Sequence, residues 1–214
     1  MLKNPFSIVR RYRITAEKAG CFEEIFVEQP YYWLAQQATP NTTLIDIGAK
    51  IGETAIYFAM FPNIKKVIAF EPMPFSYNMM RENITKNPLR EKIEIQNMAI
   101  SDTEKQRRID KDRIMNGKYS FSYAKNDGGG QVIKSVSLSN AIKGLKNVMI
   151  KSDCEGDEEF MFNGADLSEV YAMEIEYHSN LKGVMGALAG RGFILKTKAL
   201  GSSWGLIYAI REKK

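Results

Sequence analysis

The feature that most constrains the fold is a short apolar run that ends in an acid and is followed by two spaced glycines, residues 44–52 (LIDIGAKIG). The β-rich start of this run predicts a buried strand. Gly48 and Gly52 let the backbone turn sharply and approach a ligand closely before a helix begins. The N-terminus of that helix favours an anionic group. The segment therefore predicts an α/β domain with a ligand at the carboxyl end of its first strand.

Strands and helices alternate along the rest of the chain. Strands are predicted at residues 43–47, 66–71, 93–99, 148–153, 172–177, 193–197 and 206–211, and helices at 52–60, 74–86, 157–163 and 180–190. This alternation predicts a doubly wound, mostly parallel sheet of seven strands. Right-handed crossovers place the loops that follow the strands along one edge of the sheet, where ligands bind.

Two segments do not follow this alternation of strands and helices. Residues 1–40 carry aromatic and apolar residues at helical intervals and predict an N-terminal helical extension, ahead of a Rossmann-like domain over residues 41–214. Tyr31 and Trp33 in this extension could line a substrate mouth, but core packing is the interpretation that we favour. Residues 102–140 combine short β-like pieces with a turn at 126–130 (NDGGG) and predict a β-rich antiparallel insertion before the fourth strand.

Composition and charge narrow the class of protein. No apolar run approaches the roughly 20 residues of a membrane span, and the N-terminus lacks the apolar core of a signal peptide. The two cysteines, Cys21 and Cys154, are in no metal-binding spacing, so we expect a cytoplasmic protein with reduced thiols and no membrane partner. Residues 101–147 hold ten Lys/Arg against five Asp/Glu, a surplus equal to the net charge of +5. Such a segment can attract an anionic substrate, although a solvated charged surface is the interpretation that we favour.

The glycine spacing favours S-adenosylmethionine over a dinucleotide, whose motif has three glycines spaced G-x-G-x-x-G. Glu71 ends the second predicted strand about 20 residues after the loop, where a carboxylate can accept the ribose hydroxyls of an adenosyl group. After the third strand, apolar residues within 97–100 could sandwich the adenine ring. Ser101 or Asp102 could then hydrogen-bond the exocyclic amine of the ring, although a simple Ser-Asp turn is the alternative.

The ends of the fourth and fifth strands carry groups suited to the reaction. Asp153 and Glu155 lie close together after Lys151, which is costly unless a sulfonium, the Lys151 ammonium or a divalent metal supplies positive charge; acids at a helix N-terminus are the alternative. Alternation along the fifth strand places Glu174, Glu176 and His178 on one face. Flanking acids raise the basicity of an imidazole and orient it, which suits a general base, whereas a structural histidine is the alternative.

In this order, the segments at 46–52, 71–74, 97–102, 151–156 and 174–178 resemble the FkbM family of S-adenosylmethionine-dependent methyltransferases over about residues 42–210. The resemblance implies a class I methyltransferase sheet whose last strand is antiparallel, and methyl transfer to a hydroxyl oxygen, often on a sugar or natural product. Two departures affect the ligand contacts. Lys50 stands where the family usually has Asn, and Ser137-Leu138-Ser139 stands where the family usually has a Thr-Leu-Asp element.

The resemblance also implies roles for individual residues. Glu71 would bind the ribose, and Asp153 and Glu155 would lie beside the methyl group and the acceptor. The residues expected to bind the cofactor are Asp46, Gly48, Lys50, Gly52, Glu71, Pro72, Ser101, Asp102 and Asp153. The residues expected to be catalytic are Asp153, Glu155 and His178.

The sequence thus predicts a methyltransferase that uses S-adenosylmethionine and acts on a small-molecule hydroxyl. We predict no metal ion, although Asp153, Glu174 and His178 would be the donors if a metal were bound. The alternatives are an RNA methyltransferase that uses the basic insertion, with nucleic acid as a less favoured partner, and a binding module without turnover. An oxidoreductase is disfavoured because the dinucleotide motif is missing. The oligomeric state is not encoded in any pattern that we recognise.

Overall fold

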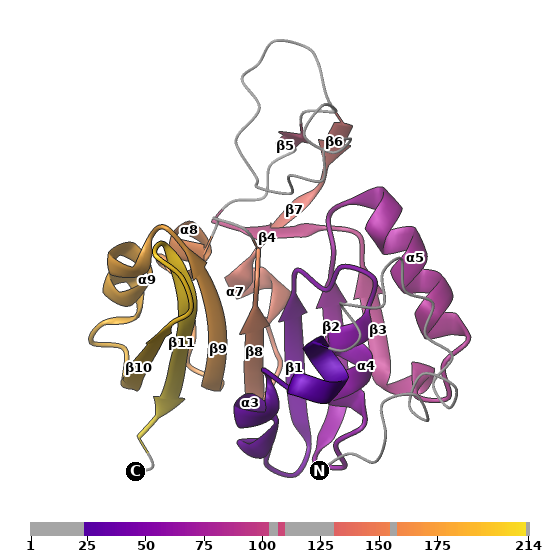
Figure 1. Ribbon diagram of the computed structural model, residues 1–214, viewed down its shortest axis with the longest axis horizontal. Helices are drawn as coiled ribbons and strands as arrows, with labels where there is room; N and C mark the ends of the chain where they lie inside the picture. The colour runs from indigo at the N-terminus through magenta and orange to yellow at the C-terminus, as the bar shows by residue number, and fades with distance from the viewer. Residues whose placement is uncertain (1–23, 103–106, 110–130, 155–157, 213–214) are drawn as a thin grey trace.

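The computed structural model describes residues 24–102, 107–109, 131–154 and 158–212, and a seven-stranded sheet forms its centre (Figure 1). The strand order is β10-β11-β9-β8-β1-β2-β3. The strands span Thr42–Ile47 (β1), Ile64–Phe70 (β2), Ile93–Gln96 (β3), Val148–Ser152 (β8), Val170–His178 (β9), Phe193–Ala199 (β10) and Trp204–Arg211 (β11). Neighbours from β3 to β9 pair in parallel, whereas β11 is antiparallel to both β9 and β10. The predicted doubly wound, mostly parallel sheet with an antiparallel last strand is confirmed.

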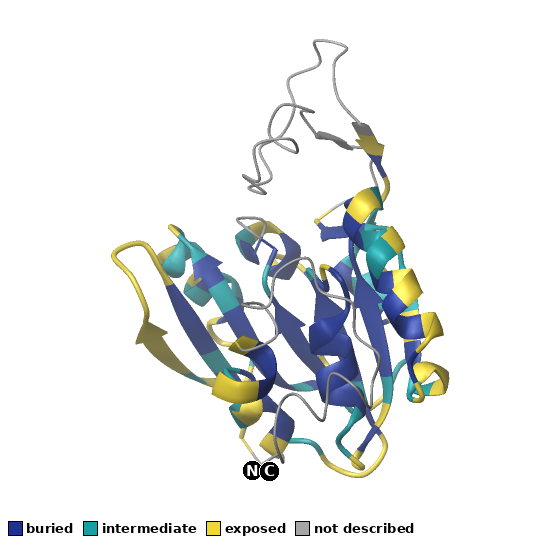
Figure 2. Ribbon diagram, turned by 45° about the vertical axis from the view of Figure 1, so that its right-hand side comes forward, coloured by how far each residue is buried: buried dark blue, intermediate teal, exposed yellow. Residues whose placement is uncertain are grey.

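Helices cover both faces of this sheet. They span Glu24–Glu28 (η1), Tyr32–Gln36 (α3), Glu53–Ala59 (α4), Pro74–Thr85 (α5), Arg90–Lys92 (η2), Leu138–Ala141 (α7), Glu158–Phe162 (α8) and Leu181–Leu188 (α9). Leu44 and Met149 pack with η1, α3 and α4 in one apolar core, whereas Ile45 and Ile150 pack with α7, α8 and α9 in another. Successive strand residues therefore serve opposite faces, as the pleat requires. The central strands are buried, and the outer side of α5 is exposed (Figure 2).

The third predicted strand, 93–99, is divided in the structure. β3 ends at Gln96, and Ala99–Ser101 (β4) instead pairs in parallel with Ser135–Ser137 (β7). Between them, the Asn97 amide donates to the carbonyls of Glu71 and Pro72 at 2.9 and 3.1 Å, which ties this point to the chain after β2. Asn97 thus ends the ladder with β2 and starts the crossing toward β7.

Part of the predicted β-rich insertion falls on described residues. Arg107–Ile109 (β5) and Gln131–Ile133 (β6) form an antiparallel pair beyond the carboxyl edge of the main sheet (Figure 1). The predicted β piece at 119–123 and the turn at 126–130 lie outside the described residues. Residues 137–139, where the FkbM pattern has an acid, join the end of β7 to the start of α7, with Ser137 as the N-cap. There the Ser137 hydroxyl accepts the Asn140 N–H and the Ser139 hydroxyl accepts the Asp166 N–H.

Of the aromatic residues before β1, Tyr31 is buried and Trp33 is partly buried, whereas Tyr32 is 42% exposed, and Tyr31 also lines one of the cavities described below. α3 lies against β9, an inner strand, and Leu34 is fully buried there. Trp33 meets Tyr208 of β11 edge-on, with ring centroids 4.8 Å apart. Within the described residues, no helix is both long enough and apolar enough to cross a bilayer. Residues 1–23, which include Cys21, lie outside the described part.

Candidate active site

The glycine loop after β1 contains three residues with left-handed backbone conformation. Gly48, Lys50 and Gly52 have φ of +74°, +52° and +90°. The N–H groups of Gly48 and Ala49 both donate to the Phe70 carbonyl, which fixes the loop against the end of β2. A Cβ atom on Gly48 would collide with the carbonyl oxygen of Asp153, so glycine is required for the loop to pass the end of β8. Lys50 occupies a region that Asn adopts more readily than Lys, which gives the departure from the FkbM pattern a backbone cost.

A buried ion pair supports the loop from beneath. Lys151 Nζ lies 3.2 Å from Asp46 Oδ1 and donates to the Gly48 carbonyl at 3.0 Å. Asp46 Oδ2 accepts the Thr54 hydroxyl at 2.5 Å. Burial lowers the pKa of Lys151, but the carboxylates of Asp46 and Asp153 outweigh that effect and raise the pKa above its usual value. Lys151 is therefore a charged group that holds Asp46 and the loop carbonyls in place.

A cavity that we call the main cavity opens beside this loop at the carboxyl edge of the sheet. Its empty volume is about 820 Å³, part of it open to solvent. Five of the predicted cofactor-binding residues line the main cavity: Gly48, Lys50, Glu71, Pro72 and Asp153.

The other four predicted cofactor-binding residues are not among those that line the main cavity. Asp46 is fully buried beneath the loop. Gly52 precedes α4 and packs toward Met80. Ser101 is buried, and its hydroxyl lies 2.9 Å from a carboxylate oxygen of Asp102.

The wall of the main cavity next to Glu71 is apolar. Met98 and Ile100 line it, as the sequence analysis expected for residues 97–100, and so do Phe70 and Met73. The last two were not singled out from the sequence because Phe70 looks like an ordinary strand residue and Met73 like a helix start. Their place on either side of the Glu71-Pro72 pair is the pattern that could have revealed them.

Glu71 is a buried carboxylate with fixed geometry. Its Oε2 accepts the Lys50 N–H at 2.9 Å and its Oε1 accepts the Met73 N–H at 2.8 Å. Burial raises the pKa of Glu71 to about 7, and these two hydrogen bonds reduce the shift. A carboxylate can accept about four hydrogen bonds, so each oxygen retains capacity for a ligand hydroxyl.

A second cavity, which we call the inner cavity, adjoins the first and shares Gly48, Lys50 and Asp153 with it. Glu53 lines the inner cavity and was missed by the sequence analysis, although its position directly after Gly52 was available as a signal. The residue is 5% exposed, and its Oε2 has no hydrogen-bond partner among the described residues. Burial raises the pKa of Glu53 to about 7, against the opposing effects of its own backbone N–H and of Lys50.

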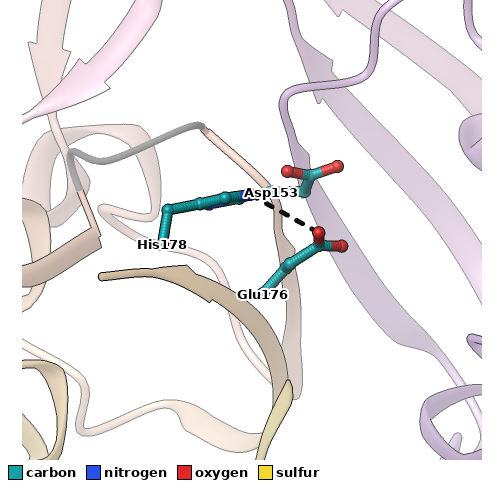
Figure 3. A group of neighbouring side chains, drawn as sticks. All are labelled: Asp153, Glu176 and His178. Carbon is teal, nitrogen blue, oxygen red and sulfur yellow. Dashed lines mark ion pairs between the residues drawn. The ribbon is translucent and has the colours of Figure 1, made fainter. Parts of the chain in front are cut away.

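Three ionisable side chains meet at the ends of β8 and β9: Asp153, Glu176 and His178 (Figure 3). One ligand atom from each lies within 4.8 Å of the other two. His178 Nε2 is 3.5 Å from Glu176 Oε1, and His178 Nδ1 is 3.4 Å from Oε1 of Glu158, a buried residue of α8. We refer to Asp153, Glu176 and His178 as the carboxylate–histidine cluster.

Glu174 does not belong to this cluster, in contrast to the metal donors named from the sequence. It pairs in register with Lys151 of β8 and is fully buried against α3. Glu176, two residues nearer the end of β9, stands in the cluster where the sequence predicted Glu174. Glu155, predicted to be catalytic, lies outside the described residues.

An open hollow, which we call the outer cavity, adjoins the cluster on the side of β11. It is lined by Glu176, His178, Ser179, Ser203 and Trp204. The Trp204 side chain is partly exposed, with 40% of its surface accessible. Two residues of the carboxylate–histidine cluster therefore face the outer cavity, and the third, Asp153, faces the main and inner cavities.

Residues 26–125 match the family model of the TRM5/TYW2 methyltransferase domain. None of the curated proteins compared with the sequence matches it. Among solved structures, precorrin-6y C5,15-methyltransferase from Geobacter metallireducens superposes with a TM-score of 0.56 at 13% identity, over 92% of this chain and 93% of that one. The fold is that of a class I methyltransferase.

Other structures with this methyltransferase fold come from different families. A putative tRNA (m1A22) methyltransferase from Streptococcus pneumoniae, solved with S-adenosyl-L-methionine, has a TM-score of 0.51 at 15% identity, over 86% of this chain and 72% of that one. The methyltransferase FkbM from Methylobacillus flagellatus has a TM-score of 0.53 at 13% identity, over 96% of this chain and 57% of that one. The FkbM structure is one of several such neighbours, so the likeness shows the fold and does not single out the FkbM family.

Proposed function

We propose that the protein is an S-adenosylmethionine-dependent methyltransferase that methylates a hydroxyl group of a sugar or another small metabolite. The observation that carries this proposal is the position of Asp153. Asp153 lines the main and inner cavities and also stands in the carboxylate–histidine cluster, whose other members line the outer cavity. A cofactor in the first two cavities and an acceptor in the third would meet at this cluster.

The residues present fit S-adenosylmethionine, which supplies an already activated methyl group. The glycine at position 48 lets the loop pass directly against the Asp153 carbonyl, so that the loop borders both the main and the inner cavity. In the main cavity, Glu71 would accept the ribose hydroxyls, and the apolar wall that includes Met98 and Ile100 would hold the adenine ring. In the inner cavity, the Oε2 of Glu53, which has no hydrogen-bond partner in the described part of the chain, would receive the ammonium of the methionine part, which a buried carboxylate favours.

The chain's own residues would then align the acceptor and take up its proton. Glu158 faces Nδ1 of His178, which leaves Nε2 directed to Glu176 and the acceptor side. In this orientation, Nε2 can accept the proton of an acceptor hydroxyl as a general base. Asp153 and, by prediction, Glu155 would fix the positions of the reacting groups, which is the larger part of catalysis for an activated methyl donor.

The outer cavity suits a hydroxylated small molecule. Trp204 offers a partly exposed indole on which an apolar sugar face can rest, and Ser179 and Ser203 offer hydroxyls beside it. An aromatic surface combined with a few hydrogen-bonding groups that orient the ligand is the usual lining of a small-molecule site.

An RNA acceptor is the second candidate, and the match to the TRM5/TYW2 domain favours it together with the basic surplus in residues 101–147. However, the match runs from residue 26 to residue 125 and so covers the cofactor half, from η1 to β5 among the described elements. The acceptor side, from β8 onward, lies beyond it. We therefore rank the small-molecule acceptor first on the chemistry of the cluster and the outer cavity.

A transfer assay with S-adenosylmethionine labelled in the methyl group tests the proposal. The wild-type protein is expected to label hydroxylated small molecules in a panel of sugars, lipids and RNA. His178→Asn should lose transfer but keep cofactor binding by calorimetry, whereas Glu71→Gln should weaken cofactor binding. Glu94→Gln, an exposed residue of β3 paired with Lys66, is the control and should match the wild type.

The outcomes separate the candidates. Label that appears in RNA alone, with binding that weakens steeply as salt rises, would support the second candidate. Cofactor binding without transfer to any acceptor class would indicate a binding module. If S-adenosylmethionine does not bind to the wild-type protein at all, both enzymatic proposals are wrong.

A further inference from the structure

We propose that Asp153, Glu176 and His178 bind one divalent metal ion that holds the acceptor hydroxyl beside the methyl donor. The acceptor role rests on the proposed function. The ion site itself stands on the three side chains, their spacing and the contacts behind them.

The spacing of the donor atoms is close to that of a metal site. One oxygen of Asp153, one oxygen of Glu176 and one ring nitrogen of His178 all lie within 4.8 Å of one another. Adjacent ligands bound to one ion at about 2.1 Å are about 3.0–3.4 Å apart, and opposite ligands about 4.2 Å apart. Side-chain movements of up to about 1 Å would therefore close the site. Glu176 and His178 are two residues apart on β9, so the pleat directs both to the same side of the sheet.

A contact outside the cluster orients the imidazole for such a role. Oε1 of Glu158 lies 3.4 Å from His178 Nδ1 and also accepts the Cys154 N–H at 3.3 Å. A metal-binding histidine almost always gives its other ring nitrogen to a carboxylate or carbonyl, which fixes the tautomer and the ring orientation. Glu158 supplies this carboxylate, and it leaves Nε2 on the side of Glu176.

The charges favour a cation in the same place. The carboxylates of Asp153 and Glu176 share a small, partly buried space, where two like charges repel each other unless a cation lies between them. Lys151 approaches this space only from the Asp153 side, because its Nζ lies against Asp46 and the loop carbonyls. A divalent ion would supply the positive charge that the sequence analysis called for at the end of β8.

The donor set favours a metal ion that accepts both oxygen and nitrogen ligands. Two carboxylate oxygens and one imidazole nitrogen suit Mn²⁺, Fe²⁺ or Zn²⁺ better than Ca²⁺ or Mg²⁺, which prefer oxygen ligands alone. Three protein ligands leave coordination positions open for a substrate. Because Glu176 and His178 line the outer cavity and Asp153 lines the other two, the open positions would lie between acceptor and donor.

The ion would change the role of His178 from base to ligand. An acceptor hydroxyl bound to the ion is more acidic and loses its proton to water. Its oxygen then forms a bond to the methyl carbon as the methyl–sulfur bond breaks. The electron pair of that bond remains on sulfur, so the products are a methyl ether and a neutral thioether.

The test of the ion site is a titration of the full chain with Mn²⁺, after treatment with a chelator and dialysis, with free Mn²⁺ measured by electron paramagnetic resonance. The wild-type protein is expected to bind one Mn²⁺ per chain. Glu176→Gln and Asp153→Asn should each weaken binding at least tenfold. Glu174→Gln is the matched control, because it makes the same change two residues earlier on the same strand, and it should bind as the wild type does. Circular dichroism shows whether each variant is folded.

Two results would overturn the site: no Mn²⁺ binding by the wild-type protein, or equal binding by Glu176→Gln and Glu174→Gln. Calorimetry with S-adenosylmethionine and the transfer assay, each with and without chelator, separate this inference from the proposed function. Cofactor binding should survive the chelator, whereas transfer should be lost and then restored by Mn²⁺. Transfer that the chelator leaves unchanged would overturn the acceptor role while the proposed function stands. Mn²⁺ binding without cofactor binding or transfer would overturn the proposed function and the acceptor role, and the ion site would stand.

Discussion

Lys151 and Asp46 form a buried ion pair of 3.2 Å between neighbouring strands of the sheet. The same ammonium donates to the carbonyl of Gly48, so one cation binds both the Asp46 carboxylate and the glycine loop. Both side chains are buried. A buried ion pair is costly to separate, because the partner left behind has no solvent to stabilise its charge. The pair therefore acts as the internal support of the cofactor side.

Replacing Lys151 with Met is expected to lower the free energy of unfolding by about 3–5 kcal/mol, because Asp46 would be left as an unpaired buried charge. Urea denaturation followed by circular dichroism measures this change. The double variant Asp46→Asn with Lys151→Met should recover part of the loss, since neither charge remains. Lys146→Met removes a cation from an exposed ion pair with Glu169 and is the control. A loss in Lys151→Met no larger than in this control would contradict the supporting role.

Replacing Gly48 with Ala is expected to destabilise the protein and to impair cofactor binding. The new Cβ would collide with the carbonyl of Asp153, in addition to the strain of a φ of +74°. Gly144 is a matched control because its φ is +76° and a Cβ there would meet none of the described residues within 4 Å. Gly144→Ala should therefore show the backbone cost alone, about 1–2 kcal/mol. Thermal melts and calorimetry with S-adenosylmethionine compare the two, and equal effects on both properties would exclude a steric role for Gly48.

The fold was predictable because its determinants are local and periodic. The run around Asp46, the glycines at 48 and 52, and the alternation of apolar strands with helices specify a parallel α/β sheet without knowledge of any long-range contact. The strand that ends near Gln96 was predicted too long, because the Asn97 side chain ends it through a contact with the chain after β2.

The sequence predicts where most site residues lie along the edge of the sheet, but it predicts less well which side chains contact one another. Strand-end acids could be placed at one edge of the sheet, but the pairing of Lys151 with Asp46 depends on the register of β1 with β8. Likewise, alternation gives Glu174 and Glu176 the same side of β9 but does not show which of them reaches Asp153. The burial of Glu53 depends on how α4 packs, which no spacing in the sequence reports.

The affinity for S-adenosylmethionine is expected to depend on pH through Glu71. Ribose hydroxyls would donate to the ionised carboxylate, and burial raises the pKa of Glu71 to about 7. As the pH falls below this value, the carboxylate gains a proton, and Glu71 alone should raise the dissociation constant by up to about tenfold per pH unit, in addition to the contribution of Glu53, whose pKa is also about 7. Calorimetry between acidic and mildly alkaline pH measures the dependence. Glu71→Gln should bind more weakly and with a flatter profile, whereas Glu94→Gln should follow the wild type. An unchanged slope in Glu71→Gln would assign the dependence to another group.

The stability of the ligand-free protein is expected to depend on pH through Glu53. The pKa of Glu53 is raised by burial to about 7 in the folded protein, from an ordinary value of 4.5. Between these values the folded state keeps a proton that the unfolded state has released, so the free energy of unfolding falls as the pH rises. Glu53→Gln removes this contribution. It should make the protein more stable than the wild type above pH 7, by up to about 3 kcal/mol, and should have little effect near pH 4.5.

Urea denaturation of both proteins at a series of pH values measures this difference. Glu82→Gln, an exposed position on α5, is the control, and its stability should run parallel to that of the wild type. The difference between Glu53→Gln and the wild type isolates Glu53, because Glu71 and Glu174 contribute equally to both proteins. Saturating S-adenosylmethionine should reverse the order at neutral pH, since the ammonium of the ligand would stabilise the ionised Glu53 carboxylate that the variant lacks. A constant difference across the whole pH range would show that Glu53 is not the group whose ionisation opposes folding.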